Sequence, residues 1–252
     1  MDFTGKTALV TGASRGIGKA VAEALAARGA RVAVNYRTNK EAAIAALASM
    51  SGGPHVAIQA DVSEPDEVER LFEEAVAALG VIDIVVNNAG IYRYHKIDEV
   101  EFDEWQQSWK EVLDTNLMGP ANVCYHAARH MIENDGGHIV NVSSRGAFRG
   151  EPEGPAYGAS KAGLNAMSQS LALRLAPHNI FVGVVAPGFV ETDLGARVLD
   201  GPLGDSVRAQ SPLNRAARPE EVAYAVLFLA SKGSEFSTGT IIDVNGASYL
   251  RS

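Results

Sequence analysis

Short apolar runs alternate along this chain with longer segments rich in alanine and glutamate. The apolar runs predict strands near 6–11, 31–36, 55–60, 82–87, 137–143, 180–186 and 239–244. The segments between them predict helices near 16–28, 39–49, 65–79, 102–133, 157–176 and 219–230. Apolar strands that alternate with helices are typical of a parallel sheet covered on both faces. The pattern therefore predicts an α/β fold.

A glycine-rich turn follows the first predicted strand and opens the first predicted helix. It spans Gly12, Gly16 and Gly18 with the spacing G-x-x-x-G-x-G. Such a turn lets backbone N–H groups approach a diphosphate, and the helix N-terminus adds a partial positive charge. The spacing differs from the common G-x-G-x-x-G fingerprint and lacks the G-K-[ST] ending of a P-loop. A tight connection is the alternative, but the strand and helix context favours a dinucleotide site.

Tyr157 and Lys161 lie four residues apart in a predicted helix. That spacing stacks their side chains on one face. A cation beside a phenol favours the phenolate, so we expect the phenol to exchange protons nearer neutral pH than its reference pKa of about 10. On its own, the pair also fits an ordinary helix surface.

The order of these motifs resembles that of the short-chain dehydrogenase/reductase family. The chain carries T-G-x-x-x-G-x-G from Thr11 to Gly18, N-N-A-G at 87–90 and Y-x-x-x-K from Tyr157 to Lys161. The resemblance extends from about residue 3 to 246. It implies a Rossmann-like, doubly wound, seven-stranded parallel sheet in the order 3-2-1-4-5-6-7, with helices on both faces. Residues 1–252 would form one such domain, in which 190–218 is an insertion and a candidate substrate lid.

The resemblance implies four catalytic residues: Asn116, Ser144, Tyr157 and Lys161. Tyr157 would be the acid/base and Ser144 would hold the carbonyl oxygen, while Lys161 would lower the pKa of the phenol and bind the ribose. Ser144 is preferred to Ser143 because successive side chains of a strand point to opposite faces. Its interval to Tyr157 also matches the family.

Pro120 makes a separate prediction about Asn116. Proline lacks the N–H that would bond to the carbonyl four residues earlier, and that carbonyl belongs to Asn116. We expect the helix to depart from straight α-helix there, leaving the oxygen free for a water that relays protons to Lys161. A simple bend around the core is the alternative.

The family's cofactor-binding positions fall at the carboxyl ends of the predicted strands, where such a sheet binds its ligand. Asp61 and Val62 would border the adenine, and Asn88 and Gly90 would line the cofactor, although Asn88 could serve only backbone groups at the strand end. The full set is Gly12, Ser14, Arg15, Gly16, Ile17, Gly18, Tyr36, Arg37, Asp61, Val62, Asn88, Ala89, Gly90, Tyr157, Lys161, Pro187, Gly188, Val190 and Thr192.

The end of the second predicted strand bears on the choice of coenzyme. A carboxylate there would bind the ribose hydroxyls and repel a 2′-phosphate, but the position holds Tyr36, followed by Arg37. With Arg15 in the glycine turn, two guanidiniums are available for a phosphate, which favours NADP(H) over NAD(H). Solvated surface arginines are the alternative.

Composition narrows the class of protein. The formal net charge of −8 favours a soluble protein and argues against a nucleic-acid partner. The lone cysteine, Cys124, excludes a disulfide framework and is expected to be a buried small hydrophobe. No secretory leader or membrane-spanning run is seen, so the cytoplasm is the expected location. We expect no metal site, with His95 as a solvent-exposed loop residue.

The expected reaction interconverts a ketone and a secondary alcohol. Within the family the chain looks closest to the 3-oxoacyl-[acyl-carrier-protein] reductases, although Asp135 and His178 stand where those enzymes carry basic residues that dock the carrier. An NAD-linked alcohol or sugar dehydrogenase and a catalytically silent dinucleotide sensor are the alternatives. The resemblance implies a homotetramer. Apolar residues of the helices that would form it suggest a further buried face, namely Val123, Met131, Leu164, Met167 and Leu171.

Overall fold

The computed structural model describes residues 1–251, and of Arg197 only the backbone. In this part of the chain seven strands form a parallel sheet in the order β3-β2-β1-β4-β5-β6-β7. The strands are β1 (Thr7–Val10), β2 (Arg31–Tyr36), β3 (Val56–Gln59), β4 (Ile84–Asn87), β5 (Gly137–Val142), β6 (Ile180–Pro187) and β7 (Ile241–Val244). The predicted Rossmann-like, doubly wound sheet is confirmed.

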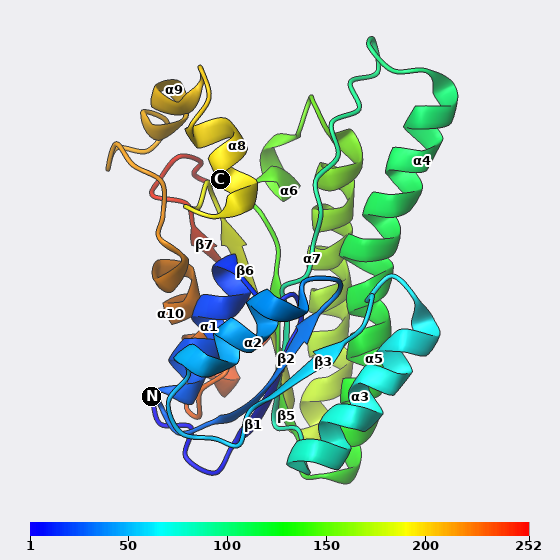
Figure 1. Cartoon of the computed structure of the whole chain (residues 1–252), viewed down its shortest axis with the longest axis vertical. Coiled ribbons are helices and arrows are strands. Elements are labelled where there is room, and N and C mark those ends of the chain that lie inside the picture. The colour runs from blue at the N-terminus through cyan, green and yellow to red at the C-terminus, as the bar shows by residue number, and fades with distance from the viewer. Residues whose placement is uncertain (252) are drawn as a thin grey trace.

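Helices cover both faces of this sheet (Figure 1). One apolar cluster joins the sheet to α1 (Gly16–Ala26), α2 (Lys40–Ser49) and α10 (Pro219–Leu229). A second cluster joins the other face to α3 (Pro65–Leu79), α5 (Gly119–Glu133) and α7 (Pro155–Leu175). Cys124 lies in the second cluster, buried as expected. The two clusters fix the carboxyl ends of the strands at one edge of the sheet, where the predicted site residues gather.

The long helix predicted over 102–133 is interrupted. It consists of α4 (Phe102–Leu113), a π-helical turn from Asp114 to Met118, and α5. The Gly119 N–H bonds to the Asp114 carbonyl five residues earlier. The predicted departure from straight α-helix at Asn116 is confirmed, one turn before Pro120.

Three short helices had no sequence prediction. They are α6 (Gly146–Arg149), which follows β5, and α8 (Asp193–Leu199) and α9 (Gly204–Arg208), which lie in the candidate lid. Single 3₁₀ turns span Ala176–His178 and Glu235–Ser237. Elements this short contain too few residues for a helical repeat of apolar positions to stand out.

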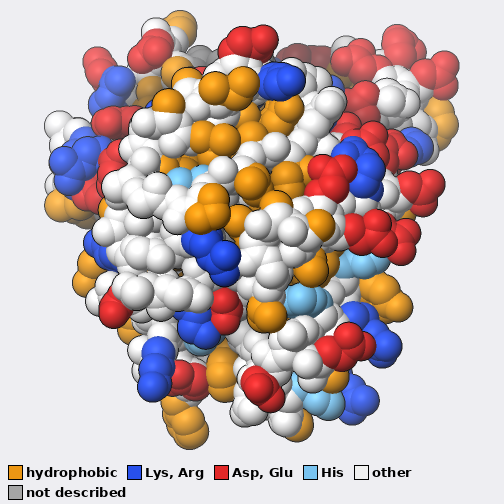
Figure 2. Space-filling view, turned by 60° about the horizontal axis from the view of Figure 1, so that its bottom comes forward, with side chains coloured by type: hydrophobic (Ala, Val, Ile, Leu, Met, Phe, Trp, Pro, Cys, Tyr) orange, Lys and Arg blue, Asp and Glu red, His pale blue; other side chains and the backbone are white. Residues whose placement is uncertain are grey.

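The surface differs from the expected apolar face. Val123, Met131 and Leu164 are buried inside the subunit, so they leave no free face for assembly, and that expectation was wrong for these residues. The most exposed large apolar side chains on the same helices are Tyr125 and Leu173, which are 64% and 84% exposed, and Ile132 on α5 is 41% exposed. On the face drawn in Figure 2, hydrophobic side chains gather toward the upper middle and acidic ones toward the right edge.

None of the described helices combines the length and apolarity that crossing a membrane requires.

Candidate active site

The turn between β1 and α1 is closely packed against the end of β4. Gly12 has φ +61, and a Cβ on it would lie 2.9 Å from the Ala89 Cα. A Cβ on Gly18 would lie 2.5 Å from the Gly12 carbonyl oxygen and would overlap the Asn88 side chain. Neither position has room for a larger residue, so glycine allows the two segments to approach.

The N-terminus of α1 is open to an anion. Arg15 precedes the helix but makes no side-chain hydrogen bond to it, and the Lys19 N–H is the one that bonds back to the Arg15 carbonyl. The N–H groups of Gly16, Ile17 and Gly18 precede this bond, as is usual in a first helical turn. They can receive diphosphate oxygens, so this turn fits the dinucleotide that the sequence predicts.

Asn88 holds the glycine turn in place. Its amide nitrogen donates to the carbonyl oxygens of Thr11 at 3.0 Å and Gly12 at 3.1 Å. The neighbouring Asn87 amide donates to Asn141 Oδ1 at 2.8 Å. Asn88 thus bonds to backbone groups at the strand end, as its alternative role predicted, whereas Asn87 bonds to side chains. Asn88 therefore fixes the position of the glycine turn relative to the end of β4.

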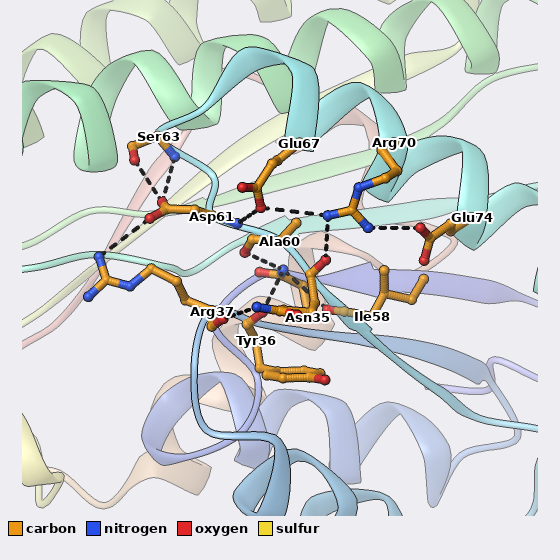
Figure 3. A network of polar contacts seen from close by, with 11 residues as sticks. Asn35, Tyr36, Arg37, Ile58, Ala60, Asp61, Ser63, Glu67, Arg70 and Glu74 are labelled. Atoms are coloured by element: carbon orange, nitrogen blue, oxygen red, sulfur yellow. Dashed lines mark hydrogen bonds and ion pairs between the residues drawn. The ribbon is translucent and has the colours of Figure 1, made fainter.

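Figure 3 shows the end of β2, where the coenzyme's adenosine is expected. Arg37 Nη1 lies 3.6 Å from Asp61 Oδ2. Asp61 Oδ1 also accepts hydrogen bonds from Ser63, from the backbone N–H at 3.0 Å and from the hydroxyl at 2.7 Å. Tyr36 is only 8% exposed and belongs to the core, while Val62 is also buried. Arg37 and Asp61 are thus the accessible polar side chains of this predicted group.

Gly90, Asn116 and Lys161 meet at the carboxyl ends of the central strands. A Cβ on Gly90 would lie 3.3 Å from Asn116 Oδ1 and 3.6 Å from Lys161 Nζ. Asn116 is fully buried, and its side chain pairs with the backbone of Ile91, accepting from the N–H at 2.8 Å and donating to the carbonyl at 2.9 Å. The π-helical turn therefore carries a side chain that anchors the loop after β4.

The two serines after β5 point in different directions. Ser143 is buried, and its hydroxyl donates to the Lys161 carbonyl at 3.3 Å. Ser144 is partly exposed, and its Oγ accepts from the Gly146 N–H at 3.0 Å. A hydrogen bond between the Ser144 side chain and the Tyr157 phenol lowers the pKa of that phenol. This arrangement agrees with the choice of Ser144 over Ser143.

Tyr157 and Lys161 are both driven toward their neutral forms. Burial raises the pKa of the Tyr157 phenol to about 12, against the lowering effect of Ser144. Burial also lowers the pKa of Lys161 to about 8. Lys161 Nζ donates to the Val142 carbonyl at 2.9 Å and lies 5.8 Å from the centre of the Tyr157 ring. The sequence predicted a lowered phenol pKa, whereas the structure shifts it upward, because burial is the largest influence on Tyr157.

The candidate lid begins against the glycine turn. A Cβ on Gly16 would lie 3.2 Å from the Thr192 Cγ2, and Arg15 Nη1 lies 3.2 Å from Asp193 Oδ2. Thr192 caps α8 by accepting from the Gly195 N–H at 3.3 Å. Before it, the Gly188 N–H bonds to the Val244 carbonyl at 3.0 Å, and Val190 pairs with Ala217 in a parallel bridge. Pro187, Gly188, Val190 and Thr192 thus line the path from β6 to the glycine turn.

The expectation for His95 was wrong. Its side chain is fully buried and packs edge-on against Trp105 at 5.4 Å between ring centroids. Its Nδ1 donates to the Arg93 carbonyl at 2.9 Å, and its Nε2 accepts from the Ala156 N–H at 3.3 Å. The two tryptophans of α4 supply an apolar cover that a loop sequence does not reveal. Among the described residues no group of three or more His, Cys, Asp or Glu side chains could hold a metal ion.

Glu151 lies near the predicted acid/base, in the segment from Phe148 to Pro152 that the sequence predicted to line the substrate pocket. Burial raises the pKa of its carboxyl group, and its negative charge in turn raises the pKa of Tyr157. A Cβ on Gly146 would lie 2.8 Å from its Cγ, which places the side chain against α6. Its sequence neighbourhood, Gly150-Glu151-Pro152, has the composition of an ordinary turn and gives no signal of this position.

Known proteins are similar to this chain over almost its whole length. A family model described as enoyl-(acyl carrier protein) reductase matches residues 12–247. The 3-oxoacyl-[acyl-carrier-protein] reductase of Staphylococcus aureus is 40% identical over 247 residues, which cover 97% of this chain and 98% of the relative. The enzyme of the same name from Aquifex aeolicus is 40% identical over 251 residues, which cover 99% of each chain.

Solved structures show the same likeness. A short-chain dehydrogenase of Burkholderia cenocepacia in complex with NADP has a TM-score of 0.89 and 35% identity, covering 98% of this chain and 99% of that one. A dehydrogenase/reductase of Sinorhizobium meliloti has a TM-score of 0.91 and 34% identity, covering 99% and 97%. The chain belongs to the short-chain dehydrogenase/reductase family of oxidoreductases.

Proposed function

We propose that the protein is an NADP(H)-dependent oxidoreductase that reduces a ketone to a secondary alcohol, with Tyr157 as the acid. The observation that carries this proposal is the convergence of Ser144, Tyr157 and Lys161 beside Gly90 and Asn116. A catalytically silent dinucleotide sensor would not need the hydroxyls of Ser144 and Tyr157 next to the buried amine of Lys161.

The glycine turn, the α1 N-terminus and Arg37 would hold the coenzyme, and the ends of β4 and β6 would flank its nicotinamide. When bound, the reduced nicotinamide supplies a hydride to the carbonyl carbon. The Ser144 hydroxyl donates a hydrogen bond to the carbonyl oxygen, where negative charge develops. The Tyr157 phenol then gives that oxygen its proton, which completes the alcohol.

The protonation state of Tyr157 is compatible with a role as the acid in ketone reduction. Because burial raises the pKa of the Tyr157 phenol to about 12, the phenol is protonated at neutral pH and can act as an acid. After transfer, the phenolate is stabilised by the ammonium form of Lys161. A water on the Asn116 carbonyl would return the proton from solvent, since Pro120 offers that carbonyl no N–H.

Replacing Tyr157 with phenylalanine tests the reaction directly. Tyr157→Phe should lose about 10²-fold or more of ketone-dependent NADPH oxidation, because the proton donor is gone, while its NADPH affinity stays near that of the wild type. Turnover is followed at 340 nm over a panel of ketones, and coenzyme affinity by fluorescence titration. NADPH binding by the wild type without turnover of any ketone would support the sensor, and unchanged turnover in Tyr157→Phe would contradict Tyr157 as the acid. Faster turnover with NADH than with NADPH would support the NAD-linked alcohol or sugar dehydrogenase.

NADP(H) is favoured over NAD(H) because Arg37 is more than half exposed beside the expected ribose, and Arg15 lies in the adjacent turn. Asp61 is close enough to Arg37 to compete for it, so the 2′-phosphate would have to displace a 3.6 Å ion pair. Exposed pairs of this kind contribute little stability and separate readily.

The substrate would be a small carbonyl compound, with a 3-oxoacyl thioester among the candidates. Docking of an acyl carrier protein is disfavoured, because the two positions noted for it present an acid, Asp135, and an imidazole, His178, both exposed. The two turns adjoin, since the Gly137 N–H bonds to the Asn179 carbonyl. An acidic carrier would meet a carboxylate there. A nucleic-acid partner is likewise disfavoured by the net charge of −8.

We further propose that the enzyme works in the cytoplasm as a homotetramer. Tyr125 on α5 and Leu173 on α7 are exposed apolar side chains on the two helices through which family resemblance predicts assembly.

A further inference from the structure

A buried arginine lies directly after the candidate catalytic serine. Arg145 is only 5% exposed. Its Nη1 donates to the Ser248 hydroxyl at 2.7 Å, and its guanidinium carbon lies 5.2 Å from the centre of the Phe189 ring. Among residues 1–251, it has no carboxylate within ion-pair distance, and Ser248 is the one hydrogen-bond acceptor found for its side chain. A guanidinium has five N–H donors, so most of them are unused.

Burying the Arg145 guanidinium without an anionic partner has an unfavourable free energy. Burial of an unpaired charge is strongly unfavourable, and a neighbouring hydroxyl and an aromatic ring offset only part of that cost. Burial lowers the pKa of Arg145, but a guanidinium stays charged at every physiological pH. The remaining donors of Arg145 are not among the fully buried side-chain atoms that lack a partner, so they are accessible to an anion in the adjoining cavity.

There is space for that partner. A cavity of about 160 Å³ is lined by Arg145, Phe189, Ser211 and Ser248. It lies between the lid and the C-terminal segment that follows β7, which run side by side in Figure 1. The other charged residues on its wall, Arg215 and Glu221, neutralise each other through two hydrogen bonds of 2.7 and 2.6 Å. Arg145 is thus the cation on the cavity wall without an ion-pair partner; the negative charge of Glu151, which is not part of that wall, acts on it from beyond ion-pair distance.

This cavity adjoins the reaction site. Arg145 follows Ser144 in sequence, and its backbone N–H donates to the Pro187 carbonyl at 2.8 Å. Phe189, on which the guanidinium rests, comes two residues after that proline, on the path that would flank the nicotinamide. Arg145 thus joins the cavity wall to the segment that carries Ser144, and a substrate spanning the two would hold its ketone at Ser144 and extend a short chain into the cavity.

We propose that Arg145 binds a carboxylate on the substrate, so that the natural substrate is an oxo acid with its ketone a few atoms from the acid group. This inference rests on the proposed ketone reduction at the same site. A carboxylate matches the single free guanidinium, with the Ser248 hydroxyl as an additional donor. A phosphate monoester would bring up to two negative charges to one cation.

Kinetics on a matched set of ketones tests the assignment. The set is 4-oxopentanoate, its methyl ester and 4-oxopentyl phosphate, each assayed with NADPH. Wild type should prefer 4-oxopentanoate to the ester in kcat/KM by roughly tenfold to a hundredfold, the effect of one charge-assisted contact. Arg145→Met should abolish that preference while leaving the ester's kcat/KM within about threefold. Arg174→Met, an exposed arginine near the far end of α7, is the control and should retain the preference.

A binding measurement separates this inference from the proposed reaction. Calorimetry with butyrate and butyramide needs no turnover, and the wild type and Tyr157→Phe should bind butyrate at least tenfold more tightly than the amide. If no ketone is reduced but butyrate binding depends on Arg145, the anion site stands and the reaction is wrong. If wild type treats acid and ester alike, or Arg145→Met keeps the preference, the inference is overturned. An Arg145-dependent preference for the phosphate overturns the carboxylate assignment.

Wild-type discrimination between butyrate and butyramide remains informative even if Arg145→Met does not fold. A second copy's C-terminal carboxylate could also fill the cavity. In that case Arg145→Met would change the oligomeric state, and the wild type would not distinguish 4-oxopentanoate from its methyl ester, which again overturns the proposal.

Discussion

At the scale of single residues, burial governs the ionisable groups of the site. Tyr157 and Lys161 are both displaced toward neutrality, the phenol to a pKa of about 12 and the amine to about 8. The phenol must regain its proton after each turnover. A neighbouring amine that can gain or lose a proton near neutral pH suits that requirement. Their spacing could be predicted from the sequence, but their desolvation could not, because it depends on segments distant in sequence that pack around them.

Lys161 makes a pH-dependent contribution to stability. Its folded-state pKa of about 8 lies below its ordinary 10.5, so folding disfavours the charged form. The penalty, on the order of 3 kcal/mol, is fully present below about pH 8 and disappears as the pH rises to about 10.5. Wild type should therefore gain stability relative to Lys161→Met across that window.

Thermal melts of both proteins from pH 7 to 10.5 measure this difference. Other titrating groups largely cancel between the two proteins, and the lost hydrogen bond to the Val142 carbonyl adds an offset that does not vary with pH. A difference between the two melting temperatures that does not change with pH would contradict the burial of a charged Lys161.

At the scale of elements, strands and the glycine turn were predictable, since apolar runs and glycine spacing are local features. Pro120 likewise predicted the departure from α-helix at Asn116, because a missing N–H acts on a carbonyl at a fixed interval. The short helices α6, α8 and α9 were not predictable. Their positions depend on contacts such as the Thr192 cap and the Arg15–Asp193 pair.

The glycine turn offers a test of close packing. Gly18→Ala would place a Cβ 2.5 Å from the Gly12 carbonyl oxygen, so the turn must shift, and we expect a loss of about 1–3 kcal/mol in the free energy of unfolding, together with weaker NADPH binding. Gly163→Ala in α7 is the matched control. Its nearest neighbour is the flexible end of Leu117 at 3.1 Å, and alanine's higher helix propensity offsets the crowding. Urea denaturation compares the two, and equal losses would contradict a special role for the turn.

At the scale of the whole molecule, the sheet order followed from family resemblance and is confirmed. Sequence patterns failed where a side chain's surroundings come from several elements. His95 is covered by tryptophans of α4, and Val123, expected on a free face, lies in the core. The cavity beside Arg145 combines a strand end, the lid and the C-terminal segment, so no local pattern could indicate it.

Assembly is testable at this scale. Tyr125→Glu and Leu173→Glu should each shift the protein from tetramer toward smaller species, because a charge would be buried where apolar side chains meet. Ile44→Glu changes an exposed apolar residue on α2, away from these helices, and should leave the tetramer intact. Sedimentation velocity distinguishes the species. A wild type that sediments as a monomer, or a tetramer unaffected by both substitutions, would contradict the proposed interface.

The hydrogen bond between the Ala156 N–H and the His95 imidazole limits which changes of chain length this enzyme can tolerate, in evolution or in the laboratory. The imidazole accepts this hydrogen bond through its Nε2. Tyr92 comes three residues before His95, and its ring lies 5.0 Å from the ring of Tyr157. An insertion or deletion between β4 and α4 would be transmitted to the residue that delivers the proton. New substrate ranges should therefore arise through changes of length within 190–218, where the chain can be remodelled without moving the phenol.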